Sequence, residues 1–168
     1  MPTIGEHIEY GLARLLYNFR GHDAGLFYHN LPADKEQLAV TSPECGPSNS
    51  YLTTKHTPLE GNKEDFPALS WSLPADADKT AVKEWLIVCE DPDAPIPTPI
   101  IHGIYYGIPA GKTELINEDF KPVGGEASRR LAGGFCYGPN FRNKVYMGPK
   151  PPAGHGAHSR LSLSPSQY

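Results

Sequence analysis

The segments WLIVCE at 85–90, DPDAP at 91–95 and IIHGIYY at 100–106 decide the fold. The first and last are apolar and rich in β-branched residues, which is typical of core strands. Residues 91–99 between them carry two carboxylates and four prolines. Proline donates nothing to a ladder and restricts the preceding residue, so these residues are predicted to form a stiff loop. Binding and catalytic residues concentrate in loops that rigid strands position, and His102 lies just inside the second strand.

The composition favours a single domain, 1–168, that is mainly β. The chain has 168 residues, enough for a core of its own, and 39% of them are hydrophobic. It contains 17 glycines and 18 prolines, well above average usage. Turns and loops therefore take up much of the chain, which favours a β-rich architecture over a helical bundle.

Charge and cysteine content exclude several classes of function. The net charge is −4 and no Lys/Arg run exceeds the pair at 129–130, so we expect no nucleic-acid partner. We expect no membrane span and no secretion or transit signal, because neither a long apolar run nor a basic N-terminus is present. Cys45, Cys89 and Cys136 are widely spaced, which predicts free thiols, no disulfide framework and a cytoplasmic location.

One helix is predicted over about 4–20, within an N-terminal helical segment 1–24. Its apolar residues recur at helical spacing, and Thr3 with Glu6 matches a capping box at its start. The polar face is not cationic, so we expect the apolar face to cover the sheet and not to anchor a membrane.

The remaining pattern predicts a core over 37–158. Runs rich in β-formers predict further strands at 37–41, 51–56 and 68–73. Residues 133–140 are predicted to be a loop, and the Ser-rich residues 159–168 an atypical, barely apolar tail.

Asp91 and Asp93, with His102, form the first group that could carry chemistry. Paired carboxylates near a histidine serve as acid and base, bind a metal, or orient one another by hydrogen bonds. The alternative is structural: aspartate commonly caps turns, and a lone histidine in an apolar run is usually a satisfied core residue. Cys89 precedes this loop and is assigned to the core, because its strand position and neighbouring acids disfavour a reactive thiolate.

His155 and His158 form the second group, in the Gly/Pro-rich residues 148–158. Their spacing suits a metal, but no cysteine or third histidine is adjacent, so no metal site is predicted. Glycines expose backbone N–H groups that form anion nests. Histidines beside such a nest predict a receptor for phosphate or carboxylate.

Together, DPDAP at 91–95, His102 and GPKPPAGHGAH at 148–158 resemble the phosphatidylethanolamine-binding protein family, and residues 42–47, 69–71 and 102–106 are most similar to its fungal members. The resemblance covers roughly 37–158. It implies a mainly β fold, an antiparallel Greek-key β-sandwich with an N-terminal helix. Both groups then converge on one anion pocket, where a buried aspartate beside two imidazoles would favour their protonated forms.

Position by position, the resemblance assigns the pocket residues. Asp91 is the pocket aspartate, His102 and His158 are the pocket histidines, and Asp93 braces the loop. The walls are assigned to Pro95, Gly148, Pro151 and Pro152.

The resemblance implies binding of a small anion such as phosphate, phosphoethanolamine or a carboxylate, or of a phospholipid headgroup. One alternative is a regulatory inhibitor with a kinase or serine protease as partner. Another is an enzyme or accessory protein acting on a carboxylate-bearing fungal metabolite. Catalytic residues are not assigned, although His102, His158 and Asp91 would be the candidates; no cofactor is expected.

The C-terminus departs from the family pattern. Family members usually continue His-Arg-Tyr and then an apolar strand, whereas His158 is followed by Ser159-Arg160 and ten residues in all. We therefore expect a core strand and part of the pocket rim to be missing, as in a truncated or differently spliced product.

Overall fold

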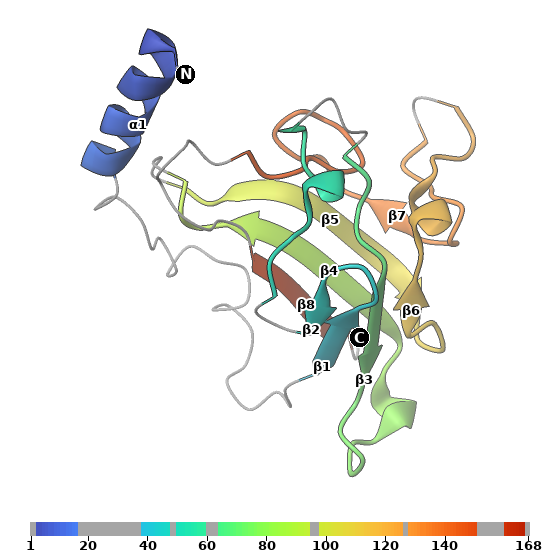
Figure 1. The fold of residues 1–168 in the computed structure, drawn as a ribbon. Coiled ribbons are helices and arrows are strands. Elements are labelled where there is room, and N and C mark those ends of the chain that lie inside the picture. The colour runs from blue at the N-terminus through green and yellow to red at the C-terminus, as the bar shows by residue number, and fades with distance from the viewer. Residues whose placement is uncertain are drawn as a thin grey trace.

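The computed structural model describes residues 3–16, 38–47, 50–59, 64–94, 98–125, 128–150 and 160–166. Its described residues form one α-helix, α1 (Ile4–Leu16), and two four-stranded antiparallel sheets (Figure 1). This confirms the predicted mainly β class. The Greek-key connections stay a prediction.

The two sheets follow these strand orders. The first sheet consists of β2 (Gly46–Pro47), β1 (Ala39–Ser42), β3 (Leu69–Ser72) and β6 (Glu114–Leu115). The second consists of β7 (Cys136–Tyr137), β5 (Ile100–Pro109), β4 (Glu84–Asp91) and β8 (Arg160–Ser166). Short 3₁₀ helices lie at Thr54–His56, Lys79–Ala81 and Asn117–Phe120.

Both sheets contribute side chains to one core. Trp71 of β3 and Trp85 of β4 meet edge to face with ring centres 5.7 Å apart, and Trp85 Nε1 donates to the carbonyl of Ala110 at 3.0 Å. Burial of such aromatic side chains is a major stabilising contribution. The buried core cluster also includes Phe66, Leu69, Ile87, Tyr105, Ile108, Leu115, Phe120, Leu131, Phe135 and Tyr146.

Most of the predicted strands are confirmed, but the strand at 51–56 is wrong. Thr54–His56 is a 3₁₀ helix, and residues 51–53 belong to no strand. The Thr57 N–H and Thr57 Oγ1 both donate to the carbonyl of Thr54, at 3.0 and 2.7 Å. These local bonds use the backbone groups that a ladder would need, so the β-forming composition is overridden.

Two short stretches predicted to lie outside strands do form them. Within the loop predicted at 133–140, β7 pairs with Tyr105 and Tyr106 of β5. In the tail, β8 pairs with β4 along its length, from Glu84 opposite Ser166 to Glu90 opposite Arg160. The sequence of β8 alternates leucine and serine over 161–164, the period of a strand. Its Pro165 is compatible with an edge strand, where a missing N–H costs little. A strand therefore follows residue 158 within the predicted tail, whereas the missing core strand and pocket rim stay a prediction.

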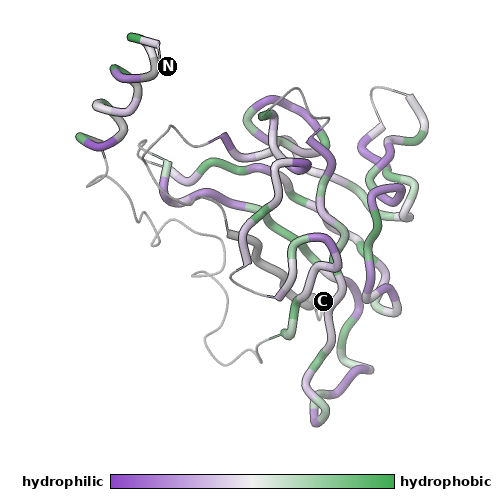
Figure 2. Tube along the Cα trace, in the orientation of Figure 1, coloured by the Kyte–Doolittle hydropathy of each residue, from purple (hydrophilic) through white to green (hydrophobic). Residues whose placement is uncertain are grey.

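Helix α1 begins at the predicted residue, but its expected packing on the sheet is wrong. Its apolar residues Ile4, Ile8, Leu12 and Leu15 are all exposed, and Ile4 retains 81% of its surface. The helix stands apart from both sheets, although hydrophobic residues recur along it (Figures 1 and 2). Helical spacing predicts an apolar face but not the surface that meets it. Residues 17–20 of the predicted helix lie outside the described residues. Among the helices described, none has the length and apolar character needed to cross a membrane.

Candidate functional site

A β-bulge places His102 outside the regular ladder. Cys89 pairs with Gly103 and Glu90 pairs with Ile101, so His102 has no residue of β4 directly opposite. A bulge leaves its extra residue unpaired and often redirects that side chain. The bulge therefore explains how a histidine within an apolar strand becomes available to a site.

The backbone and the ring of His102 are both tied to Met147. The His102 carbonyl accepts the Met147 N–H at 3.0 Å and the Asn140 side-chain amide at 2.9 Å. The ring Nδ1 lies 2.6 Å from the Met147 carbonyl oxygen. Since a carbonyl only accepts, Nδ1 carries the hydrogen, and Nε2 is the ring nitrogen that remains available to a ligand.

Asp91 caps a turn and also faces His102. One carboxylate oxygen, Oδ1, accepts the backbone N–H of Asp93 at 2.9 Å, as aspartate does in a capped turn. The other, Oδ2, lies 3.8 Å from His102 Nε2, and both side chains are almost completely buried. One side chain therefore both caps the turn and faces the histidine. Asp93 is half-buried and shapes the loop through its backbone.

His102 Nε2 is a buried polar atom without a hydrogen-bond partner in the described chain. Its distance to Asp91 exceeds hydrogen-bond length, so the contact is purely electrostatic. A buried polar group left without a partner costs about 1–3 kcal/mol and requires an explanation. A ligand group bound between His102 Nε2 and Asp91 Oδ2 would provide the missing partner.

Gly148 is the fourth predicted pocket residue that lies within the described residues, after Asp91, Asp93 and His102. It follows Met147 directly, and its N–H donates to Glu64 Oε2 at 2.9 Å. A Cβ at this position would lie 2.4 Å from the carbonyl oxygen of His56. The position requires glycine because two backbones approach closely there. Pro95, Pro151, Pro152, His155 and His158 lie outside the described residues.

Several residues that shape this site were missed by the sequence analysis. Asn140 and Met147 hold His102, but Asn140 was assigned only to a loop and Met147 was given no role. His56 was placed in a strand, yet it is completely buried and its Nε2 lies 3.8 Å from Glu44 Oε2. No local signal identifies these residues, since each acts on a partner distant in sequence.

Cys89 belongs to the core, as predicted. Burial, with smaller contributions from the charges of Asp91 and Glu90, raises the pKa of the Cys89 thiol to about 12. At pH 8 only on the order of one thiol in ten thousand would then be ionised. Cys45 and Cys136 are half-buried and free.

We therefore expect iodoacetamide at pH 8 to leave Cys89 unmodified in the folded protein, because the thiolate is the reactive form. Cys45 and Cys136 should react first, and all three should react in denaturant. Mass spectrometry of the cysteine peptides over time measures the rates. Modification of Cys89 as fast as Cys45 in folded protein would contradict the core assignment.

The described residues contain no group of three or more potential metal ligands. What they do contain is a carboxylate and an imidazole that face each other, in a two-sheet β fold. The family model of the phosphatidylethanolamine-binding protein matches residues 30–160. The chain belongs to this family.

Two fungal relatives carry the name phomoidride biosynthesis cluster protein B. The protein from Fungal sp. is 42% identical over 169 residues, which cover 96% of this chain and 76% of that protein. The protein from Talaromyces stipitatus is 38% identical over 156 residues, 90% of this chain. The chain spans only 62% of the length of that second relative.

Solved structures agree with the fold. YbcL of Escherichia coli, described as a member of the mammalian phosphatidylethanolamine-binding protein family, superposes with a TM-score of 0.55 at 24% identity. The matched region covers 75% of this chain and 74% of YbcL. A putative family homologue from Chlamydia trachomatis superposes with a TM-score of 0.50 at 22% identity, over 77% and 73% of the two chains. At these identities the comparison shows the fold alone.

Proposed function

We propose that the protein is a receptor for a small anionic ligand, such as phosphate, phosphoethanolamine or a carboxylate. The ligand would bind between His102 Nε2 and Asp91. His158 would supply a second imidazole, and the prolines at 95, 151 and 152 would shape the walls with Gly148.

The observation that carries this proposal is the unpartnered, buried His102 Nε2 opposite Asp91. Because Nδ1 is committed to Met147, a proton on Nε2 can only be directed toward the pocket side of the ring. A hydrogen bond to an anionic acceptor is charge-assisted and about twice as strong as a neutral one. When the ring is doubly protonated, an anion would therefore accept from the Nε2 hydrogen, for which the described residues provide no acceptor.

Asp91 adds selectivity to this arrangement. A carboxylate repels a bare anion but accepts from a hydroxyl or an ammonium group. A ligand with both an anionic oxygen and a donor, such as monohydrogen phosphate or phosphoethanolamine, would satisfy both sides. A fully ionised group without a donor should bind less well.

The fungal relatives are named for a biosynthesis cluster, which favours a second candidate function. We propose it as action on a carboxylate-bearing metabolite, as an enzyme or an accessory protein. The same Asp91–His102 pair would bind the carboxylate, with a histidine as acid or base. Turnover of such a metabolite that is lost in His102→Asn and kept in a surface variant would support this function. An inhibitory role toward a kinase or a protease stays a prediction.

Calorimetric titration with inorganic phosphate tests the receptor proposal by comparing the wild-type protein with the His102→Asn variant. The asparagine amide nitrogen occupies the position of Nδ1 and can still donate to Met147, but Nε2 is absent. We expect wild-type protein to give saturable heat and the variant to bind at least about tenfold more weakly, a loss of about 1.4 kcal/mol.

His7→Asn is the matched control, because His7 lies exposed on α1 and should leave binding unchanged. Folded wild-type protein that gives no saturable heat with phosphate or phosphoethanolamine would refute the receptor. So would a His102→Asn variant that binds as tightly as the wild type.

A further inference from the structure

Residues 146–148, here called the strap, run between two buried histidines. On one side, Met147 exchanges two hydrogen bonds with His102, at 2.6 and 3.0 Å. On the other side, the Tyr146 hydroxyl donates to the His56 carbonyl at 3.3 Å. Gly148 packs against the same carbonyl, where no side-chain carbon fits. The strap therefore connects the backbone of His56 to the ring of His102.

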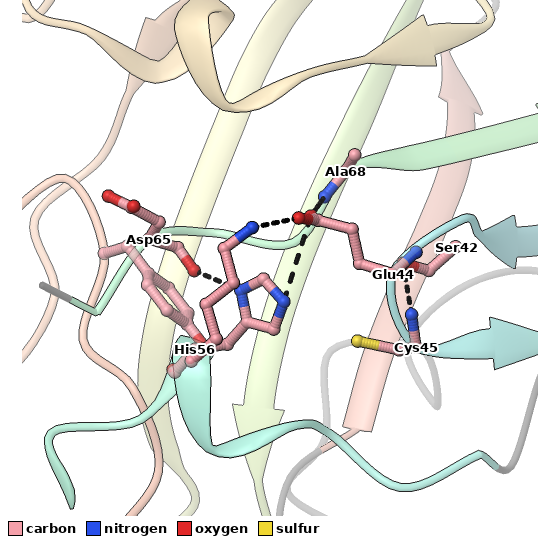
Figure 3. Close-up of polar contacts among 8 residues, drawn as sticks. Ser42, Glu44, Cys45, His56, Asp65 and Ala68 are labelled. Carbon is pink, nitrogen blue, oxygen red and sulfur yellow. Dashed lines mark hydrogen bonds and ion pairs between the residues drawn. The ribbon is translucent and has the colours of Figure 1, made fainter. Parts of the chain in front are cut away.

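The ring of His56 has surroundings of the same kind as those of His102. Its Nδ1 donates to the Asp65 carbonyl at 2.7 Å, and its Nε2 faces Glu44 Oε2 at 3.8 Å without a hydrogen-bond partner in the described chain (Figure 3). In both cases a backbone carbonyl fixes the ring, and a carboxylate lies opposite the free nitrogen. His56 is completely buried, so its ring cannot reorient without opening the core.

Glu44 is itself held in place. Its Oε2 accepts the Ala68 N–H at 2.7 Å, and its Oε1 pairs with Lys55. Although burial opposes ionisation, the bonds from Ala68 and Lys55 keep the pKa of Glu44 below its usual value. Glu44 is therefore an anion at neutral pH, and its Oε2 faces Nε2 of the buried His56 ring.

We propose that His56 is a positioning residue for the anion pocket. The His56 ring donates to Asp65 and faces Glu44, and it fixes the 54–57 turn. The His56 carbonyl then positions the strap, and the Met147 carbonyl in the strap orients the His102 ring. This inference rests on the proposed function for its effect on ligand affinity, but its effect on His102 exists without ligand.

Two substitutions at His56 distinguish the contribution of its Nδ1 from that of its Nε2. His56→Asn keeps a donor at the Nδ1 position for Asp65, whereas His56→Gln places a polar atom near the Nε2 position and loses that donor. Tyr146→Phe breaks the next link and keeps the ring. We expect His56→Gln and Tyr146→Phe each to weaken phosphate binding about three- to tenfold, and His56→Asn to restore most of the affinity.

A double-mutant cycle distinguishes positioning from simple destabilisation. Because both changes act through the same strap, His56→Gln with Tyr146→Phe should weaken binding by much less than the product of the single effects. Tyr106→Phe is the matched control, since Tyr106 is an exposed residue of β5. Fully independent effects on affinity would overturn the proposal.

The nitrogen resonances of His102 in ¹⁵N-histidine-labelled, ligand-free protein give a readout that does not depend on binding. Both Tyr146→Phe and His56→Gln should shift them, while Tyr106→Phe should not. If wild-type protein binds no phosphate but these shifts occur, the receptor proposal fails and the positioning role stands. If the His102 resonances stay unchanged in folded variants, the positioning role is refuted whether or not phosphate binds.

Discussion

Replacing Gly148 with alanine should lower the free energy of unfolding by about 2–3 kcal/mol and weaken any ligand binding that depends on His102. The added carbon would lie 2.4 Å from the His56 carbonyl oxygen and 2.9 Å from Thr57 Cα. Both are backbone atoms, so neither can move aside by changing a rotamer. The strap must shift instead, and with it the Met147 carbonyl that holds the His102 ring. Urea denaturation measures the stability, and phosphate calorimetry measures the binding.

Gly111→Ala is the matched control for this prediction. Gly111 is exposed, and a Cβ there would have no other atom within 4 Å. The substitution should change stability by no more than about 0.5 kcal/mol. Equal unfolding curves for the two alanine variants would show that the close approach at Gly148 does not exist in solution.

The central strands could be predicted because their sequence patterns and boundaries agree. β4 and β5 are long runs of β-forming residues on either side of a proline-rich loop, and β3 alternates before Pro74. Here local preference and tertiary pairing favour the same structure. β8 is serine-rich and weakly apolar, so its pairing with β4 depends on an available edge that no local pattern reveals.

The pair Asp91 and His102 could be proposed from sequence, but its geometry could not. The two residues are the last of one strand and the third of the next, so an antiparallel pair brings them near each other. Whether the histidine faces the aspartate depends on the bulge, which is a property of the register between both strands. A shift by one residue would turn the ring to the opposite face.

The role of His56 was beyond the reach of sequence patterns for a related reason. Its ring contacts Asp65 and Glu44, which belong to segments without regular structure or periodicity. Its neighbours in sequence are β-forming, and this composition predicted a strand. Hydrogen bonds between irregular segments carry no periodic signal, because no repeated geometry relates the partners.

Replacing Phe66 with alanine should have the largest effect on stability, about 3–5 kcal/mol. Phe66 is 2% exposed, and its ring contacts Tyr105, Phe120 and Tyr146 at centre distances of 5.0, 4.5 and 5.1 Å. These residues come from β5, a 3₁₀ helix and the strap, so one ring joins the second sheet to the strap. Its loss would leave a cavity between elements that cannot all collapse toward it.

Two further variants separate the loss of the ring from a general sensitivity to truncation. Phe66→Leu keeps most of the buried volume and should cost less than about 1.5 kcal/mol. Phe141→Ala removes a ring that is 79% exposed and should cost no more than about 0.5 kcal/mol. Because Phe66 packs on Tyr146, Phe66→Ala should also shift the nitrogen resonances of His102 at temperatures where it remains folded. Equal losses of stability for Phe66→Ala and Phe141→Ala would show that the aromatic cluster does not hold these elements together.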